Sequence, residues 1–224
     1  MSQKLKLKQK KKQKQKTTTK QKTDVKQRVA LHALQKQLSV LNLREALILI
    51  SFILGAGLLR VPMQAIPSAE PITFFALLAG WLFGKKKGFL VGAGALLTSN
   101  FFVFGGHGPW TLFQALGFGL AGFLGGFLRK RSGYVSTVLI AIAATLVFEL
   151  VLNISSLFIF PFGFIVFITA LPFTLIHLVS NIVFSMGLPK ARKLIYEKGQ
   201  FNERALCREL IAKFKSGKLS RAKQ

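Results

Sequence analysis

The sequence predicts an all-α membrane protein, a polytopic bundle of about six transmembrane helices with both termini in the cytoplasm. The chain of 224 residues is 51% hydrophobic, yet it carries a formal net charge of +25. The two properties separate along the chain, because Leu, Phe, Ile, Ala, Val and Gly dominate positions 46–188 while basic residues gather at both ends. The apolar runs exceed those of a soluble core of this size, which indicates a membrane protein.

The first 28 residues are expected to form a disordered, lysine-rich leader in the cytoplasm. Eleven lysines and Arg28 stand there against the single acidic residue Asp24. Such a segment cannot bury enough apolar surface to fold. Its cations are expected to attract anionic lipids, and its lack of aromatic residues argues against base stacking on nucleic acid. A cleaved signal peptide is not expected, since no early apolar run ends in small residues.

The apolar middle divides into segments that are each expected to cross the membrane. A juxtamembrane amphipathic segment over 29–43 leads into a first span, which stops before Arg60 and Pro62. Pro161 and Gly163 interrupt a later apolar stretch, so 154–167 are expected to form a loop or cap on the outer face. The spans are expected at 44–59, 71–84, 88–104, 112–128 and 135–153, with a sixth that ends near Leu188.

Basic residues at the ends of these spans predict the orientation. The membrane domain covers 44–188, and the basic tail at 189–224 is predicted to contain an amphipathic cytoplasmic helix. The leader, 85–87, 129–131 and the tail fall on one side if both termini are inside, which is the side that Lys and Arg prefer. We therefore expect a multi-pass protein of the plasma membrane.

Small residues at spacings of four predict close helix packing. Gly88 and Gly92 lie in the third span, and Gly122 and Gly126 lie in the fourth. Without a Cβ atom, helix backbones can approach closely, so spans three and four are expected to pack against each other. Such spacing also suits docking to a separate membrane subunit, for which Ser51 and Gly55 on the first span offer the best candidate surface.

Polar residues collect toward the outer face in this topology. The turn at 105–111 contains an imidazole and an indole, and an amide lies on each side of it. Polar groups in lipid cost free energy and usually face the bundle interior or a water-filled cavity. The sequence therefore predicts an outer-face pocket with these candidate residues: Arg60, Asn100, His107, Trp110, Gln114, Glu149, Asn153 and His177.

Each of these residues also has a structural interpretation. Trp110 lies in the interfacial zone, where indole rings anchor helices. Asn100 and Gln114 could hydrogen-bond each other and lock two spans together. Glu149 could pair with Arg60, carry a proton or meet a ligand. His177 and Asn181 share a helix face and could bond a neighbouring span. Arg60 and Glu70 could also form a surface pair on the first outer loop.

The sequence contains no motif of catalysis or of metal binding. It lacks the G-x-S-x-G elbow, the H-E-x-x-H pair and the P-loop, so neither an enzyme nor a cofactor is expected. The three histidines are scattered, and Cys207 is the single cysteine. Uphill transport by this chain would therefore need a partner or an ion gradient as its source of energy.

The order of the motifs resembles the substrate-binding S components of energy-coupling factor (ECF) transporters. The residues that carry the resemblance extend over 44–188 and include Arg60-Val-Pro, Glu70-Pro71, Gly88 to Gly92, Asn100, Gly108-Pro109-Trp110-Thr111, Gln114, Gly119 to Gly126, and the pair His177 and Asn181.

The resemblance implies a subunit that binds a vitamin or vitamin precursor near the outer face and delivers it inward. Its partners would be a membrane coupling subunit and two ATP-binding cassette ATPases. Where the family has Ala-x-x-x-Ala for docking, this chain has Ser51 and Gly55. Carried over, the resemblance assigns the ligand to Asn100, His107, Trp110, Gln114, Asn153 and His177.

Two other functions remain open at this stage. Glu149 and His177 could serve as a relay in an ion- or proton-coupled transporter or channel, because intramembrane ionisable groups are functional candidates. Alternatively, the chain could be a membrane tether that works through its lysine-rich leader.

Overall fold

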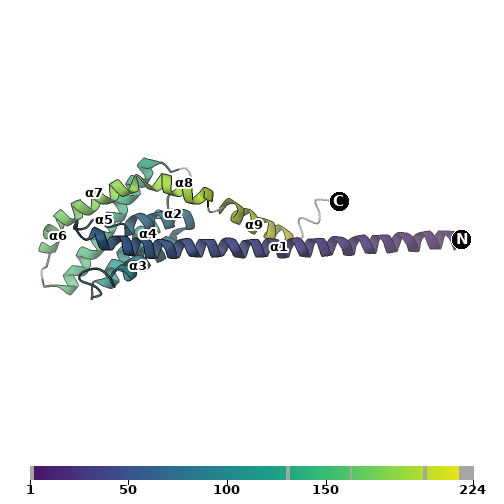
Figure 1. The fold of residues 1–224 in the computed structure, drawn as a ribbon, viewed down its shortest axis with the longest axis horizontal. Coiled ribbons are helices and arrows are strands. Elements are labelled where there is room, and N and C mark those ends of the chain that lie inside the picture. Colours follow the sequence, from purple (N-terminus) through teal and green to yellow (C-terminus); the bar gives the residue numbers. More distant parts are fainter. Residues whose placement is uncertain (1–2, 130–131, 162, 199–200, 217–224) are drawn as a thin grey trace. The chain divides into compact units, whose positions relative to one another are not determined.

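The computed structural model describes residues 3–129, 132–161, 163–198 and 201–216, which form helices and the turns between them (Figure 1). No strand occurs within these ranges, which confirms the predicted all-α class. The chain divides into two compact units, one made of residues 1–44 and 200–224 and the other of residues 45–199. The larger unit contains every candidate site residue.

The smaller unit contains the first part of α1 (Gln3–Met63) and all of α9 (Phe201–Lys215). Arg204 Nε donates a hydrogen bond to Asn42 Oδ1 at 3.0 Å. The predicted amphipathic segment at 29–43 is helical, and the same helix includes residues 3–28 of the leader, for which the sequence predicts disorder. Lysine and glutamine have favourable helix propensities, which allows a helix to continue without an apolar face. Residues 199–200 and 217–224 of the predicted tail lie outside the described residues.

The larger unit contains the last part of α1 and seven further helices among its described residues. Gly84, at a φ of 95°, separates α2 (Ile72–Phe83) from α3 (Lys85–Ser99), and glycine reaches this left-handed region without strain. The seven helices are α2 (Ile72–Phe83), α3 (Lys85–Ser99), α4 (Thr111–Gly125), α5 (Tyr134–Ile159), α6 (Ile165–Thr169), α7 (Leu171–Ser185) and α8 (Leu188–Lys198).

Glycines bring the backbones of α2, α3 and α4 into direct contact. A Cβ atom built on Gly88 would meet the carbonyl oxygen of Gly122, and one built on Gly122 would meet the carbonyl oxygen of Gly88. Gly92 lies in the same way against the backbone of Phe118, and Gly80 against Gly122. The predicted close packing of spans three and four is confirmed, and α2 joins the same contact.

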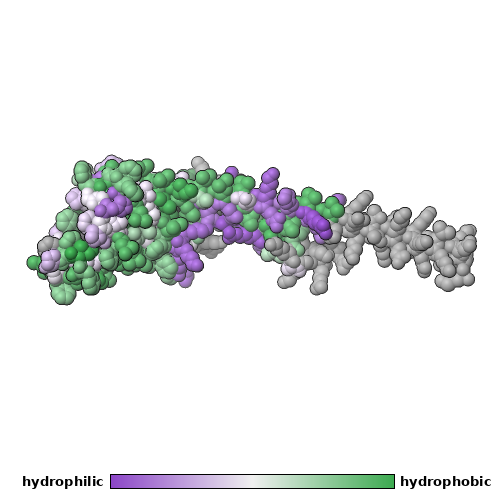
Figure 2. Space-filling view, turned by 90° about the horizontal axis from the view of Figure 1, so that it is seen from below, coloured by the Kyte–Doolittle hydropathy of each residue, from purple (hydrophilic) through white to green (hydrophobic). Residues whose placement is uncertain are grey.

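Two of the described helices are long and apolar enough to cross a bilayer, which indicates a membrane protein. These are Val25–Met63 and Tyr134–Ile159, and the bent pair Leu171–Ser185 and Leu188–Tyr196, at 42°, adds a third if it forms one span. The apolar helix α2 is about 18 Å long at 1.5 Å per residue, short of a hydrocarbon core of about 30 Å. Leu54, Leu139 and Val179 are exposed. Figure 2 shows that hydrophobic residues cover much of one face of the helices.

The loop predicted at 154–167 is wrong for residues 154–159, which extend α5 to Ile159. Within this extension the Ser155 and Ser156 hydroxyls donate to Leu152 O at 2.8 and 2.9 Å, a bond that is compatible with helix. The helix ends when Phe160 becomes extended, at φ −123° and ψ 146°. Proline disfavours the helical conformation of the residue before it, so Phe160 leaves the helix and α5 ends at Ile159.

Replacement of Gly122 by alanine is expected to destabilise the larger unit, because the new Cβ would overlap the backbone of Gly88. Overpacking of this kind costs about 1–3 kcal/mol. The measurement is thermal unfolding in detergent, followed by size-exclusion chromatography. The matched control is Gly133→Ala, since a Cβ at Gly133 has no described atom within 4 Å. Equal melting temperatures for the two variants would contradict the backbone contact.

Candidate functional site

A cavity of about 490 Å³ lies among the helices of the larger unit. Its wall combines aromatic rings with charged and amide side chains, drawn from α1, the segment before α2, and α4 to α7. Phe118 and Phe148 also belong to a buried apolar cluster, so the cavity borders the core of the unit. The charged and amide side chains in the wall are Arg60, Glu70, Gln114, Glu149, Asn153 and His177.

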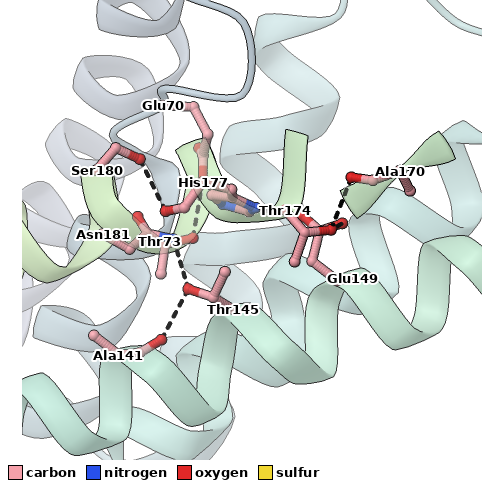
Figure 3. A network of polar contacts seen from close by, with 10 residues as sticks. All are labelled: Glu70, Thr73, Ala141, Thr145, Glu149, Ala170, Thr174, His177, Ser180 and Asn181. Carbon is pink, nitrogen blue, oxygen red and sulfur yellow. Dashed lines mark hydrogen bonds and ion pairs between the residues drawn. The ribbon is translucent and has the colours of Figure 1, made fainter. Parts of the chain in front are cut away.

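His177 lies between two carboxylates that come from different parts of the fold (Figure 3). Its Nδ1 atom is 2.6 Å from Glu149 Oε1 on α5, and its Nε2 atom is 3.3 Å from Glu70 Oε1 ahead of α2. The imidazole is 2% exposed and its ring lies edge-on to Phe148 at 5.1 Å. Glu70, His177 and Glu149 are called the carboxylate–histidine triad below.

The geometry of the triad favours one shared proton. A neutral imidazole donates from one nitrogen and accepts at the other, whereas an ionised carboxylate only accepts. With two ionised carboxylates, one ring nitrogen would therefore present a lone pair to another lone pair. Both contacts are satisfied when His177 is an imidazolium or when one carboxyl carries the proton. In either case the triad holds one extra proton and has a net charge of −1.

The rest of the structure holds both carboxylates in place. Glu70 Oε2 accepts the Ile72 backbone N–H at 2.7 Å, and Oε1 accepts the Thr73 hydroxyl at 2.9 Å, both in the first turn of α2. A negative charge is favourable there, because the N-terminal end of a helix is its positive end. Glu149 Oε2 accepts the Thr174 hydroxyl at 3.1 Å from α7. The triad thus connects α2, α5 and α7.

Arg60 provides the positive charge in the cavity wall. Its Nη1 atom donates to Ser99 Oγ and to Asn100 Oδ1, both at 3.0 Å, at the C-terminal end of α3. The Asn100 amide in turn donates to Thr111 Oγ1 at 3.5 Å. Asn100 is buried and does not line the cavity, so its position is that of a support for Arg60.

The structure brings five of the eight predicted binding residues to this cavity: Arg60, Gln114, Glu149, Asn153 and His177. It does not bring Asn100, His107 or Trp110 to the wall. Positive φ angles at Gly105 and Gly106 shape the turn, and His107 is exposed there with its ring 4.6 Å from that of Phe101. Trp110 is half-buried and covers Gly108. Asn100 bonds to Arg60 and Thr111, in place of the bond to Gln114 that the sequence also allowed.

Glu70 lines the cavity, although the sequence suggested a possible surface pair with Arg60 and did not predict Glu70 as a binding residue. It is 5% exposed and contacts His177. The available signal was its position, since an acidic residue followed by proline and an apolar run is typical of a helix start. Among the described residues no group of three or more His, Cys, Asp or Glu could hold a metal ion. The two carboxylates bind opposite ring nitrogens, so they do not converge on one point.

A second polar contact lies beside the triad, where α7 meets α5. The Asn181 amide donates to Thr145 Oγ1 at 2.9 Å, and the Thr145 hydroxyl donates to Ala141 O at 2.9 Å (Figure 3). The structural interpretation of Asn181, an interhelical bond, therefore holds.

On α1, Ser51 is exposed and a Cβ at Gly55 would have no described atom within 4 Å, so the predicted docking face is uncovered in this chain.

Glu70→Ala is expected to lower the free energy of unfolding, because it leaves the buried N–H of Ile72 without an acceptor. The cost of such an unpaired group is about 1–3 kcal/mol. Thermal unfolding in detergent measures the effect. Glu70→Gln keeps an oxygen for Ile72 and is expected to be milder than Glu70→Ala. A Glu70→Ala protein that is as stable as the wild type would show that the contact contributes little.

Comparison with protein families places the cavity within a matched region. Residues 41–203 match a family described as "Family of unknown function (DUF6580)", and this range includes every residue of the cavity wall. Neither the curated proteins nor the solved structures provide a match. The match covers well over half of the chain, and the chain therefore belongs to the DUF6580 family.

Proposed function

We propose that this chain is the substrate-binding subunit of a micronutrient uptake transporter in the plasma membrane. The observation that carries the proposal is the cavity of about 490 Å³, which combines aromatic walls with Arg60 and the carboxylate–histidine triad. Small-molecule sites are typically concave, mostly apolar and about 300–1,000 Å³ in volume, with a few polar groups that fix the ligand. Ionisable groups within membrane helices are costly and usually mark such sites.

The positions of the residues along their helices support an outer-face cavity. Arg60 is near the C-terminal end of α1, and Glu70 precedes α2. Gln114 is in the first turn of α4, and His177 is in the first half of α7. The basic residues at 85–87 and 129 are at the opposite ends of α2 and α4. The positive-inside rule then puts both termini in the cytoplasm, with six crossings in which the shorter helices are shielded by their neighbours.

The proposed partners follow from what this chain lacks. Its sequence has no P-loop, so energy for uphill uptake would come from a membrane coupling subunit with two ATP-binding cassette ATPases, as the resemblance to ECF S components implies. The uncovered face of α1 at Ser51 and Gly55 supports docking of the coupling subunit there. The lysine-rich leader is proposed to contact anionic lipids at the cytoplasmic surface.

A proton-coupled transporter is the second candidate, and the continuous contact of Glu70, His177 and Glu149 favours it. A shared proton in this triad could move between the two carboxylates through the imidazole ring. The two candidates differ in their source of energy. Uptake that needs co-expressed ATPases and survives an uncoupler supports the binding subunit. Uptake that needs no partner and stops with the proton gradient supports the second candidate.

Glu149→Gln is expected to weaken ligand binding by at least about tenfold, the value of one charge-assisted hydrogen bond. Native mass spectrometry of the purified chain identifies and quantifies the small molecule that remains bound. The matched control is Glu209→Gln, whose carboxylate lies outside the cavity and pairs with Lys213. Equal ligand occupancy in the wild type and the Glu149→Gln variant would remove Glu149 from the binding site.

Gly55→Leu is expected to reduce assembly with the coupling subunit, because a large side chain would stand on the docking face of α1. Ligand binding by the chain alone is expected to be unchanged, since Gly55 does not line the cavity. Co-purification of the co-expressed subunits measures assembly, and Gly133→Leu, at another open glycine, is the control. Normal assembly of the Gly55→Leu variant would place the docking face elsewhere.

A further inference from the structure

The charges in the cavity wall define the class of ligand more narrowly than its volume does. We infer that the ligand is a dipolar molecule, with a carboxylate that binds Arg60 and an amine that binds Glu149 and Gln114, joined by a flat apolar body. This inference rests on the proposed function of the same cavity. It narrows the vitamin or vitamin precursor that the resemblance to ECF S components implies to compounds that carry both charges.

The guanidinium of Arg60 uses Nη1 for hydrogen bonds within the protein, and its Nε and Nη2 edge can bind a ligand. Nη1 has two N–H groups, and these match its two described acceptors, Ser99 Oγ and Asn100 Oδ1. The Nε and Nη2 atoms have no hydrogen bond among the described residues. This is the edge through which a guanidinium binds a carboxylate with two parallel hydrogen bonds. Since Arg60 lines the cavity, the available edge suits an acidic group of a ligand.

Acceptors are available at Glu149 and Gln114. An ionised carboxylate has about four lone-pair sites, and the described contacts of Glu149 are one to His177 and one to Thr174. The Glu149 side chain is 13% exposed, more than that of Glu70 at 7%. Gln114 Oε1 is buried without a hydrogen-bond partner among the described residues. A buried acceptor of this kind is costly when unpaired, and an N–H group of a ligand would satisfy it.

The total charge of the wall favours a ligand with both signs. The triad has a net charge of −1 from its hydrogen bonding, and Arg60 has a charge of +1. The sum is zero, but the two charges belong to separate groups. Arg60 and Glu70 of the triad also interact electrostatically. A ligand with only a cation would leave the Nε and Nη2 edge of Arg60 without an acceptor, and one with only an anion would leave the acceptors of Glu149 and Gln114 without a donor. A zwitterion can pair with both groups and keeps the filled cavity neutral.

The apolar part of the wall determines the body of the ligand. Phe118 and Phe148 lie with ring centroids 4.2 Å apart, and Phe173 contributes a third ring from α7. Aromatic walls favour flat rings through offset or edge-to-face contacts. The expected ligand is therefore an amino acid-like compound with an aromatic or other flat body.

The first test uses three indole compounds that differ in their charged groups: L-tryptophan, L-tryptophanamide and N-acetyl-L-tryptophan. Isothermal titration of the purified full chain in lipid nanodiscs is expected to give L-tryptophan an affinity at least about tenfold above that of either blocked compound. The Arg60→Gln variant is expected to bind L-tryptophan and L-tryptophanamide with nearly equal affinity. The Glu149→Gln variant is expected to bind L-tryptophan and N-acetyl-L-tryptophan with nearly equal affinity. The controls Arg28→Gln and Glu209→Gln, outside the cavity, are expected to keep both differences in affinity.

The second test examines the compound that stays bound during purification. The compound is released by denaturation and divided between an amine-reactive and a carboxylate-reactive reagent, and a mass increase is expected with both. An increase with one reagent alone, or blocked compounds that bind as well as L-tryptophan, would overturn the dipolar ligand and leave the binding function in place. The absence of any bound compound in both tests would overturn the binding function and the dipolar ligand together.

Discussion

The contact of His177 with Glu70 and Glu149 is the interaction on which the site depends. Two carboxylates and an imidazole within a membrane domain are unfavourable when separate, because ionised groups lose their hydration there. They become tolerable when they share a proton and accept hydrogen bonds from Ile72, Thr73 and Thr174. The arrangement requires α2, α5 and α7 to be correctly placed at once. The buried charges therefore specify one packing of these helices as well as one wall of the cavity.

Arg60 follows the same logic from the other side of the cavity. Its charge is stabilised by the hydroxyl of Ser99 and the amide oxygen of Asn100, and Asn100 is in turn held by Thr111. The residues that the sequence predicts as ligand contacts thus divide into two sets. One set lines the cavity, and the other set holds the lining side chains in place. Asn100 belongs to the second set, which explains why a buried amide precedes the turn at 105–111.

Much of the fold could be predicted from composition and spacing. Apolar runs and glycine spacing predicted helices near α2, α4 and α5 and the contact between Gly88 and Gly122, because both signals are local. The end of α5 was misjudged, because Pro161 affects only the residue before it, Phe160, and the hydroxyls of Ser155 and Ser156 bond to a helix carbonyl. The role of Glu70 was missed because its partner His177 is 107 residues away, and no pattern within one segment reports such a distance.

The backbone contact among α2, α3 and α4 has a consequence for how sequences of this architecture can vary. Where Gly88 meets Gly122, no side chain takes part, so no compensating change in a neighbouring side chain can make room for a larger residue. The α5 to α7 side of the cavity is different, because it is lined by side chains such as Asn153, Thr169 and Phe173. Exchange of these groups alters the shape and polarity of the wall without disturbing a backbone contact. The cavity wall formed by α5 to α7 can therefore vary in shape and polarity while the backbone contact among α2, α3 and α4 stays the same.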